Sequence, residues 1–223
     1  MANVKSNEEL RQEKVEATVS KTEQFYNENK KIIWGGLAAV AVIALAILGY
    51  QKFIYAPKCA EAQEQTFPAE QNFQAGEYEL ALEGDGNVLG LKDIIKEYGA
   101  KAGKSVYMYA GVAELQLGNY EEALSYLKKY SGKDSILAAR ALACEGDAYV
   151  GLEDYSKAVA CYNKAAAKDD SIYAANYIFK AGLAYEKLGQ AAKALDCYKK
   201  VQDQYPASYE AVEITKFIAR VSE

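Results

Sequence analysis

The chain has 223 residues, of which 31 are Asp or Glu and 26 are Lys or Arg, so its formal net charge is −5. A nucleic-acid surface requires a concentrated basic face, which this sequence lacks, and we therefore expect no nucleic-acid partner. Histidine is absent. Its absence removes the commonest general base and zinc ligand and argues against most familiar enzyme sites.

Residues 1–31 form a charged tail with six acidic and six basic side chains. Two patterns of a hydroxyl residue followed three places later by Glu begin at Ser6 and Ser20. Such patterns are typical of helix starts, so we predict two short helices. Their apolar positions form only a thin stripe, which favours a solvated tail over a partner-binding helix.

Residues 32–50 contain no charged side chain and lie between Lys31 and Lys52. Nineteen helical residues extend about 28 Å, close to the hydrocarbon thickness of a bilayer. We predict a transmembrane helix over residues 32–51; a buried core helix is the alternative, but it would usually keep a polar stripe. No signal-peptide cleavage pattern is found, so we expect the helix to stay attached.

The orientation of this helix is predicted from the lysines that flank it. Lys21, Lys30 and Lys31 precede the span, whereas Lys52 and Lys58 follow it. Positive charge is retained in the cytoplasm, so the bias favours a cytoplasmic N-terminus. The C-terminal domain would then face the periplasmic side of the plasma (inner) membrane.

After residue 57 the sequence predicts helices joined by short turns, since only two further prolines occur. Gly111, Gly146 and Gly182 recur at intervals of 35 and 36 residues, which is the length of a helical repeat. We expect each glycine to let a second helix approach closely, with Ala158 facing Gly146 in the middle repeat. Glu153 stands where the other repeats have a turn glycine, so we expect a different turn there.

Three segments share a turn followed by a helix: 118–124, 154–159 and 189–195. On these residues and the glycine period, the chain resembles the tetratricopeptide repeat family. The resemblance implies an all-α fold, in which a tetratricopeptide α-solenoid follows the transmembrane helix. Residues 57–105 would form a degenerate first repeat, interrupted near residues 84–87. Residues 106–223 would form three repeats and a C-terminal capping helix.

The resemblance also implies a groove, lined mainly by the first helix of each repeat, that binds protein or peptide clients. The corresponding positions are Met108, Val112, Leu115, Arg140, Asp147, Asn176, Phe179, Lys180 and Leu183. Family members that clamp a carboxylate tail carry Lys and Asn where this chain has Met108 and Val112, so we do not expect that clamp. We expect no catalytic residue, metal, cofactor or small-molecule substrate.

Two other patterns have simpler interpretations. Residues 99–105 are one residue short of a phosphate-binding loop and follow no strand. Cys144 and Cys161 fall on the two helices of one repeat, where they would form either a disulfide or small core residues; we favour the core.

The order of tail, single span and repeats resembles bacterial inner-membrane proteins associated with the Sec translocon. That resemblance implies a periplasmic, chaperone-like adaptor for exported polypeptides, with translocon subunits as candidate partners. A scaffold for cell-envelope assembly and an enzyme with an unrecognised site are the alternatives.

Overall fold

The computed structural model describes residues 7–222, which divide into two compact units on either side of the boundary between Pro57 and Lys58. Within residues 7–222 every regular element is a helix. An isolated bridge between Gly84 and Leu89 is the one β-type contact in that range. The all-α expectation is therefore confirmed.

The first unit is dominated by α1, Asn7–Tyr50, which is followed by a π-helical turn, Gln51–Tyr55. The prediction of two short helices in the tail is wrong, because α1 continues through Ser20. No Gly or Pro occurs between residues 7 and 34, and Glu, Lys, Gln and Ala are good helix formers, so a capping pattern alone does not break the helix. The pattern at Ser6 begins outside the described residues.

The apolar part of α1 is exposed along its length. Ile32, Val40 and Leu45 keep 75, 65 and 68% of their surface accessible. Among the described residues, one helical stretch, Val19–Gln74, is long and apolar enough to cross a membrane, and none of its most apolar window is buried in the protein. A core helix of a soluble protein would be mostly buried, so that alternative does not fit the exposure.

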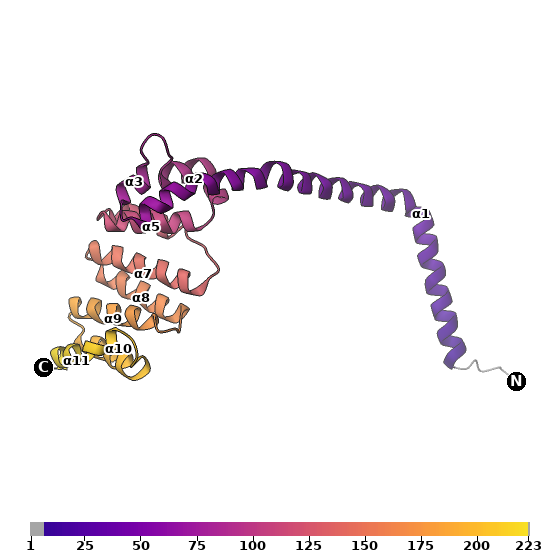
Figure 1. Cartoon of the computed structure of the whole chain (residues 1–223). Coiled ribbons are helices and arrows are strands. Elements are labelled where there is room, and N and C mark those ends of the chain that lie inside the picture. Colours follow the sequence, from indigo (N-terminus) through magenta and orange to yellow (C-terminus); the bar gives the residue numbers. More distant parts are fainter. Residues whose placement is uncertain (1–6, 223) are drawn as a thin grey trace. The chain divides into compact units, whose positions relative to one another are not determined.

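The second unit is a succession of helical hairpins that runs from top to bottom on the left of Figure 1. It begins with α2 (Ala56–Gln74), α3 (Tyr78–Glu83) and α4 (Leu91–Tyr98). A short 3-10 turn, Gly99–Ala102, leads into three hairpins and a cap. The hairpins are α5 (Ser105–Gln116) with α6 (Tyr120–Leu127), α7 (Ser135–Gly151) with α8 (Tyr155–Lys168), and α9 (Ala174–Lys187) with α10 (Ala191–Gln204). The cap is a 3-10 turn, Glu210–Glu213, followed by α11 (Ile214–Ser222).

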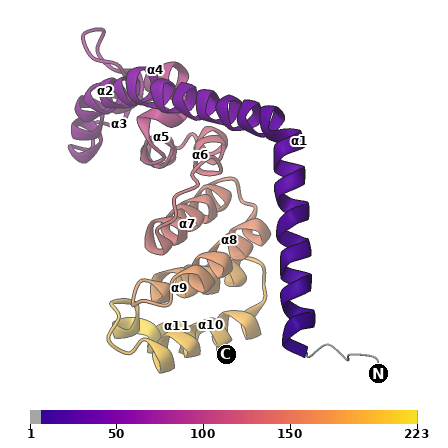
Figure 2. The ribbon, with the colours of Figure 1, turned by 90° about the vertical axis from the view of Figure 1, so that its right-hand side faces the viewer.

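The hairpins stack in sequence order. Helix α8 packs against both α7 and α9, and α10 packs against α9 and α11, as Figures 1 and 2 show. Each first helix therefore buries one side against its own hairpin partner and another against the preceding repeat. This arrangement is a tetratricopeptide-like solenoid, and its core is continuous from one repeat to the next.

The turns inside the three hairpins have one geometry. Two residues after each first helix ends, one residue has the left-handed conformation: Gly118, Glu153 and Gly189, with φ of 80°, 59° and 69°. The next N–H donates to the carbonyl five residues earlier, at 2.9 Å in all three turns. The expectation of a different turn at Glu153 is wrong. The same hydrogen bonds close the helix there, so Glu adopts a backbone conformation that glycine adopts without strain.

The close approach inside each hairpin occurs at the predicted glycines. A Cβ atom added to Gly146 would lie 2.5 Å from Cε1 of Tyr162, and one added to Gly182 would lie 2.5 Å from Cε1 of Tyr198. The prediction that Ala158 covers Gly146 is therefore wrong. Helical side chains point back toward the N-terminus of their helix, so the covering ring comes from one turn beyond Ala158. Ala158 itself is fully buried.

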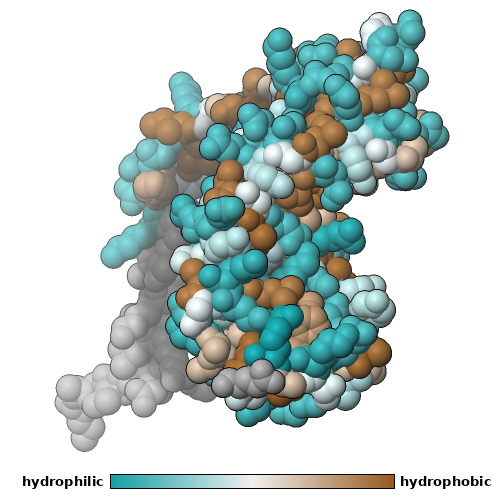
Figure 3. Space-filling model, turned by 90° about the vertical axis from the view of Figure 1, so that its left-hand side faces the viewer, coloured by the Kyte–Doolittle hydropathy of each residue, from teal (hydrophilic) through white to brown (hydrophobic). Residues whose placement is uncertain are grey.

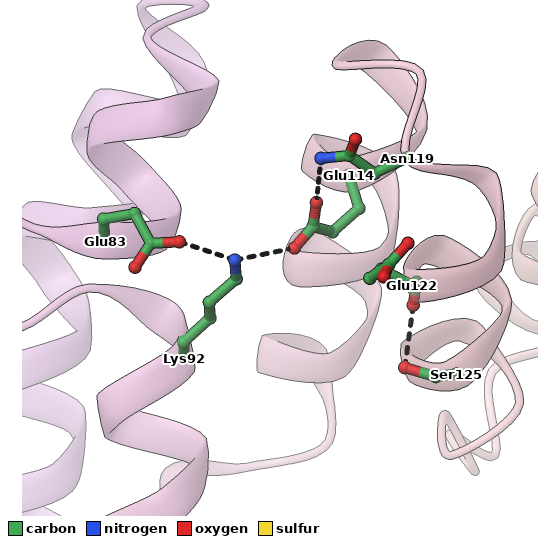
Figure 4. A network of polar contacts seen from close by, with 6 residues as sticks. All are labelled: Glu83, Lys92, Glu114, Asn119, Glu122 and Ser125. Carbon is green, nitrogen blue, oxygen red and sulfur yellow. Dashed lines mark hydrogen bonds and ion pairs between the residues drawn. The ribbon is translucent and has the colours of Figure 1, made fainter.

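A polar network joins the loop-containing segment α3–α4 to the first hairpin (Figure 4). Lys92 Nζ lies 2.5 Å from Glu83 Oε1 and 3.1 Å from Glu114 Oε1. Asn119 Nδ2 donates to the other oxygen of Glu114 at 2.8 Å. Only 1% of Glu114 is exposed, and a buried carboxylate is costly unless it is paired. The lysine and the amide together supply that pairing.

Candidate protein-binding groove

Three cavities lie along the first helices of the repeats and the C-terminal cap. The middle cavity, of about 330 Å³, is formed by α5, α7 and α9. Six of the nine predicted groove residues line it: Val112, Leu115, Arg140, Asp147, Asn176 and Lys180. These side chains come from three successive repeats, so the stacking of the hairpins brings them together.

The second cavity, called the large cavity, has a volume of about 620 Å³ and is lined by residues of α7, α8, α9 and α11. It includes Leu183 and shares Asp147 and Lys180 with the middle cavity. Tyr155 and Tyr162 supply its aromatic surface.

The third, called the cap cavity, has a volume of about 340 Å³ and is lined by α9 and the C-terminal cap. It includes Phe179 and shares Asn176 with the middle cavity. Eight of the nine predicted residues thus line at least one of the three cavities, whereas Met108 lines none of them. On the face drawn in Figure 3, hydrophilic residues predominate and hydrophobic residues lie among them in small groups.

An ion pair stands between the middle and large cavities. Lys180 Nζ lies 2.8 Å from both carboxylate oxygens of Asp147, and the Tyr162 hydroxyl donates to Asp147 Oδ1 at 2.7 Å. Burial, together with the nearby Asp147 charge, raises the pKa of Tyr162, so its hydroxyl stays protonated as a donor. The Asp147 carboxylate therefore accepts three hydrogen bonds from two partners, Lys180 and Tyr162, which fix it in place.

A second polar bridge stands between the middle and cap cavities. Asn176 Nδ2 donates to Glu210 Oε1 at 2.8 Å. A third joins the last repeat to α11, where Arg220 Nη2 lies 2.6 Å from Glu186 Oε1 and the Tyr198 hydroxyl donates to the same oxygen. Its partners are 34 residues apart, as are Asn176 and Glu210. Both bridges therefore connect the last repeat with the C-terminal cap.

Phe179 belongs both to the cap cavity and to the core. Its ring centroid lies 4.7 Å from that of Phe217 and 5.7 Å from that of Tyr198. Tyr198 is fully buried. Removal of the Phe179 ring would therefore disturb the packing of the cap as well as the cavity wall.

The four cysteines are free thiols. Burial raises the pKa of Cys144, which lines the middle cavity, to about 11, and burial also raises the pKa of Cys161. A thiol with such a pKa is protonated at neutral pH and is a poor nucleophile. Both side chains act as small packing residues in this structure. Within the described part of the chain, no group of three or more Cys, Asp or Glu side chains is arranged to hold a metal ion.

Sequence reasoning missed the residues that the cap and the second helices contribute to these cavities. Tyr162 was not assigned to the groove, and neither were Tyr209, Glu210 and Phe217. Tyr162 has a recognisable signal, since it recurs as Tyr198 in the next repeat, and each of the two rings lies against the glycine of its own hairpin. The cap residues fall outside the repeat, so the glycine period says nothing about them.

Two family models described as tetratricopeptide repeat match residues 139–167 and 177–208. Two solved structures are similar to this chain. A crystal structure of MamA is 20% identical, with a TM-score of 0.52, over 69% of this chain and 92% of that one. A crystal structure of the MamA protein is 18% identical, with a TM-score of 0.53, over 74% and 91%. At these identities the likeness concerns the fold. No curated protein matches the sequence.

The matches support the tetratricopeptide repeat family for this chain, and such repeats indicate a protein-interaction scaffold.

Proposed function

We propose that this protein is a membrane-anchored scaffold whose groove binds extended segments of other polypeptides. The observation that carries the proposal is the row of three cavities, which are separated by the Asp147–Lys180 and Asn176–Glu210 bridges. An extended client would place apolar side chains in successive cavities and its backbone amides near the bridges. Backbone recognition would suit clients of varied sequence.

We expect the contacts between the client and the groove to be mainly apolar. Val112 and Leu115 are half-buried against the core and turn their remaining surface to the middle cavity. Arg140 is exposed at the same cavity, where it would steer acidic segments. Ordering a flexible client costs free energy, so we expect weak binding, with a Kd in the micromolar range, of the order of 1–100 μM.

For the membrane, we propose that residues 32–51 span the bilayer, with the N-terminus in the cytoplasm and the solenoid in the periplasm. Support comes from an uncharged, fully exposed apolar helix and from Lys30 and Lys31 before it. Trp34 and Tyr50 near the two ends suit membrane interfaces. In that location the clients would be newly exported polypeptides, handled in a chaperone-like way near the translocon.

Site-specific photocrosslinking in native membranes tests this function. A photoreactive amino acid replaces Arg140 or Tyr173, which line the middle cavity, or Asn163, an exposed residue of α8 that lines none of the three cavities. The proposal predicts crosslinks to newly exported polypeptides from the first two positions only. Equal crosslinking from Asn163, or crosslinks to cytoplasmic proteins alone, would contradict it.

Protease digestion of spheroplasts tests the orientation separately. External protease should degrade the solenoid in intact spheroplasts, whereas protection until lysis would reverse the proposed topology.

A further inference from the structure

The C-terminal cap has an unusual outer surface. The terminal element of a solenoid ordinarily presents a polar face to solvent. Here Tyr209 and Val212 remain 89 and 77% exposed, although both line the cap cavity. Phe179 and Phe217 form the inner wall of that cavity, with their rings at 89° to one another. The cavity is thus an aromatic and aliphatic recess with three polar side chains, Asn176, Glu210 and Glu213, in its lining.

The charge of the cap cavity is opposite to that of its neighbours. Glu210 and Glu213 line it and no basic residue does, so its lining carries a charge of −2. The middle cavity has Arg140, Lys180 and Asp147, a sum of +1. A bound polypeptide therefore meets a positive groove that ends in a negative recess.

Both carboxylates of the cap cavity are available to a ligand. Glu210 accepts from Asn176 through Oε1, and no contact to its second oxygen occurs among the described residues. Glu213 pairs with Lys216 at 3.1 Å, but the two side chains are 65 and 70% exposed, and such surface pairs contribute little and exchange readily.

We propose that the cap cavity is a subsite for an arginine side chain of the bound polypeptide. The apolar stem of arginine would cover Val212, and its planar guanidinium would stack on Tyr209 while it donates to Glu210 and Glu213. The neighbouring Phe217 ring already has a guanidinium over it, since Cζ of Arg220 lies 4.7 Å from its centroid.

This subsite rests on the proposed polypeptide-binding groove. It would also fix the direction in which a client segment lies in that groove. A client segment with an arginine at one end and acidic or apolar residues beyond it would bind with the arginine at the C-terminal cap. The reverse orientation would place the guanidinium beside Arg140 and Lys180, where like charges repel.

The test is a titration of the full chain in lipid nanodiscs with a labelled ten-residue peptide of Ala and Leu that contains one arginine. The matched probe replaces that arginine with citrulline, which keeps the shape and removes the charge. Glu213→Gln should weaken binding of the arginine peptide about two- to fivefold and leave citrulline-peptide binding unchanged. Glu121→Gln, on the exposed side of α6 and outside the three cavities, is the control and should change neither.

Several results would overturn the subsite. Equal affinity of wild-type protein for the two peptides is one, and an equal loss for both in Glu213→Gln is another. A dimer of the full chain that Glu213→Gln dissociates would identify a second copy as the occupant instead. If Leu115→Ala weakens both peptides while Glu213→Gln weakens neither, the groove stands and the subsite fails. If neither peptide binds, both proposals fail.

Discussion

Gly146→Ala tests the packing inside the hairpins, because the added methyl group has no room. It would lie 2.5 Å from Cε1 and 2.8 Å from Cδ1 of Tyr162. Carbon atoms normally stay about 3.5 Å apart or more, so the ring would have to withdraw by about 1 Å. Tyr162 is only 2% exposed and its hydroxyl donates to Asp147. Movement of the ring would therefore disturb the core and the ion pair with Lys180 together.

The magnitude follows from three opposing effects. Overpacking of a core costs about 1–3 kcal/mol, and weakening of a hydrogen bond to a carboxylate costs about 1–2 kcal/mol. Alanine has a helix propensity about 1 kcal/mol better than that of glycine, which offsets part of the cost. We expect a net loss of about 1–4 kcal/mol in the free energy of unfolding, which lowers Tm by about 3–12 °C in a domain of this size.

The assay is thermal unfolding of the full chain in nanodiscs, followed by circular dichroism. Asn163→Ala, at an exposed position of the same hairpin, is the control and should leave Tm almost unchanged. A Gly146→Ala variant as stable as wild type would refute the close packing of Tyr162 on Gly146.

Three further predictions concern the turn, the cysteine and the membrane helix. Glu153→Gly should raise the free energy of unfolding by about 0.5–1 kcal/mol, because glycine adopts the left-handed conformation without strain; an unchanged urea midpoint would argue against strain there. Stability should decline as pH rises from about 9 toward 11, since the Cys144 thiol ionises near 9 when unfolded and near 11 when folded. The folded state then binds the Cys144 proton more tightly than the unfolded state does, so a rise in pH favours unfolding. Cys144→Ala should therefore reduce the difference between the urea midpoints measured at pH 8 and at pH 10. Leu45→Arg places a charge in the middle of the apolar helix, costs about 2.5–3.5 kcal/mol of insertion, and should reduce the membrane-bound fraction after alkaline extraction; full retention would contradict the single-span proposal.

Much of the fold was predictable because small residues recur at fixed positions of the repeat. Gly146 and Gly182 mark the points where a second helix approaches, and no other residue fits under the rings of Tyr162 and Tyr198. The side chain that covers each glycine was harder to predict, since it depends on the direction in which helical side chains lean. The turn at Glu153 was predicted wrongly for a related reason. The hydrogen bonds around the turn outweigh the preference of a single non-glycine residue for negative φ.

The candidate groove was predictable where it follows the repeat, as at Asp147 and Asn176. It was not predictable at the cap, where Tyr209 and Phe217 lie beyond the last matched turn. The continuous α1 shows the same limit: the capping pattern at Ser20 is a local signal, whereas helix continuation depends on the absence of a breaker over many residues.

The central claim is that the cavities along the first helices bind polypeptide, and a matched pair of leucines tests it most directly. Leu115 lines the middle cavity, whereas Leu117, two residues later, is 43% exposed and lines none of the three cavities. The measurement is a titration of the full chain in nanodiscs with a labelled, unfolded exported protein, at low and high salt, beside a thermal melt. We predict that Leu115→Ala weakens binding by about 1–2 kcal/mol at both salt concentrations, while Leu117→Ala leaves it unchanged. Equal effects of the two substitutions, or binding that disappears in high salt, would contradict it.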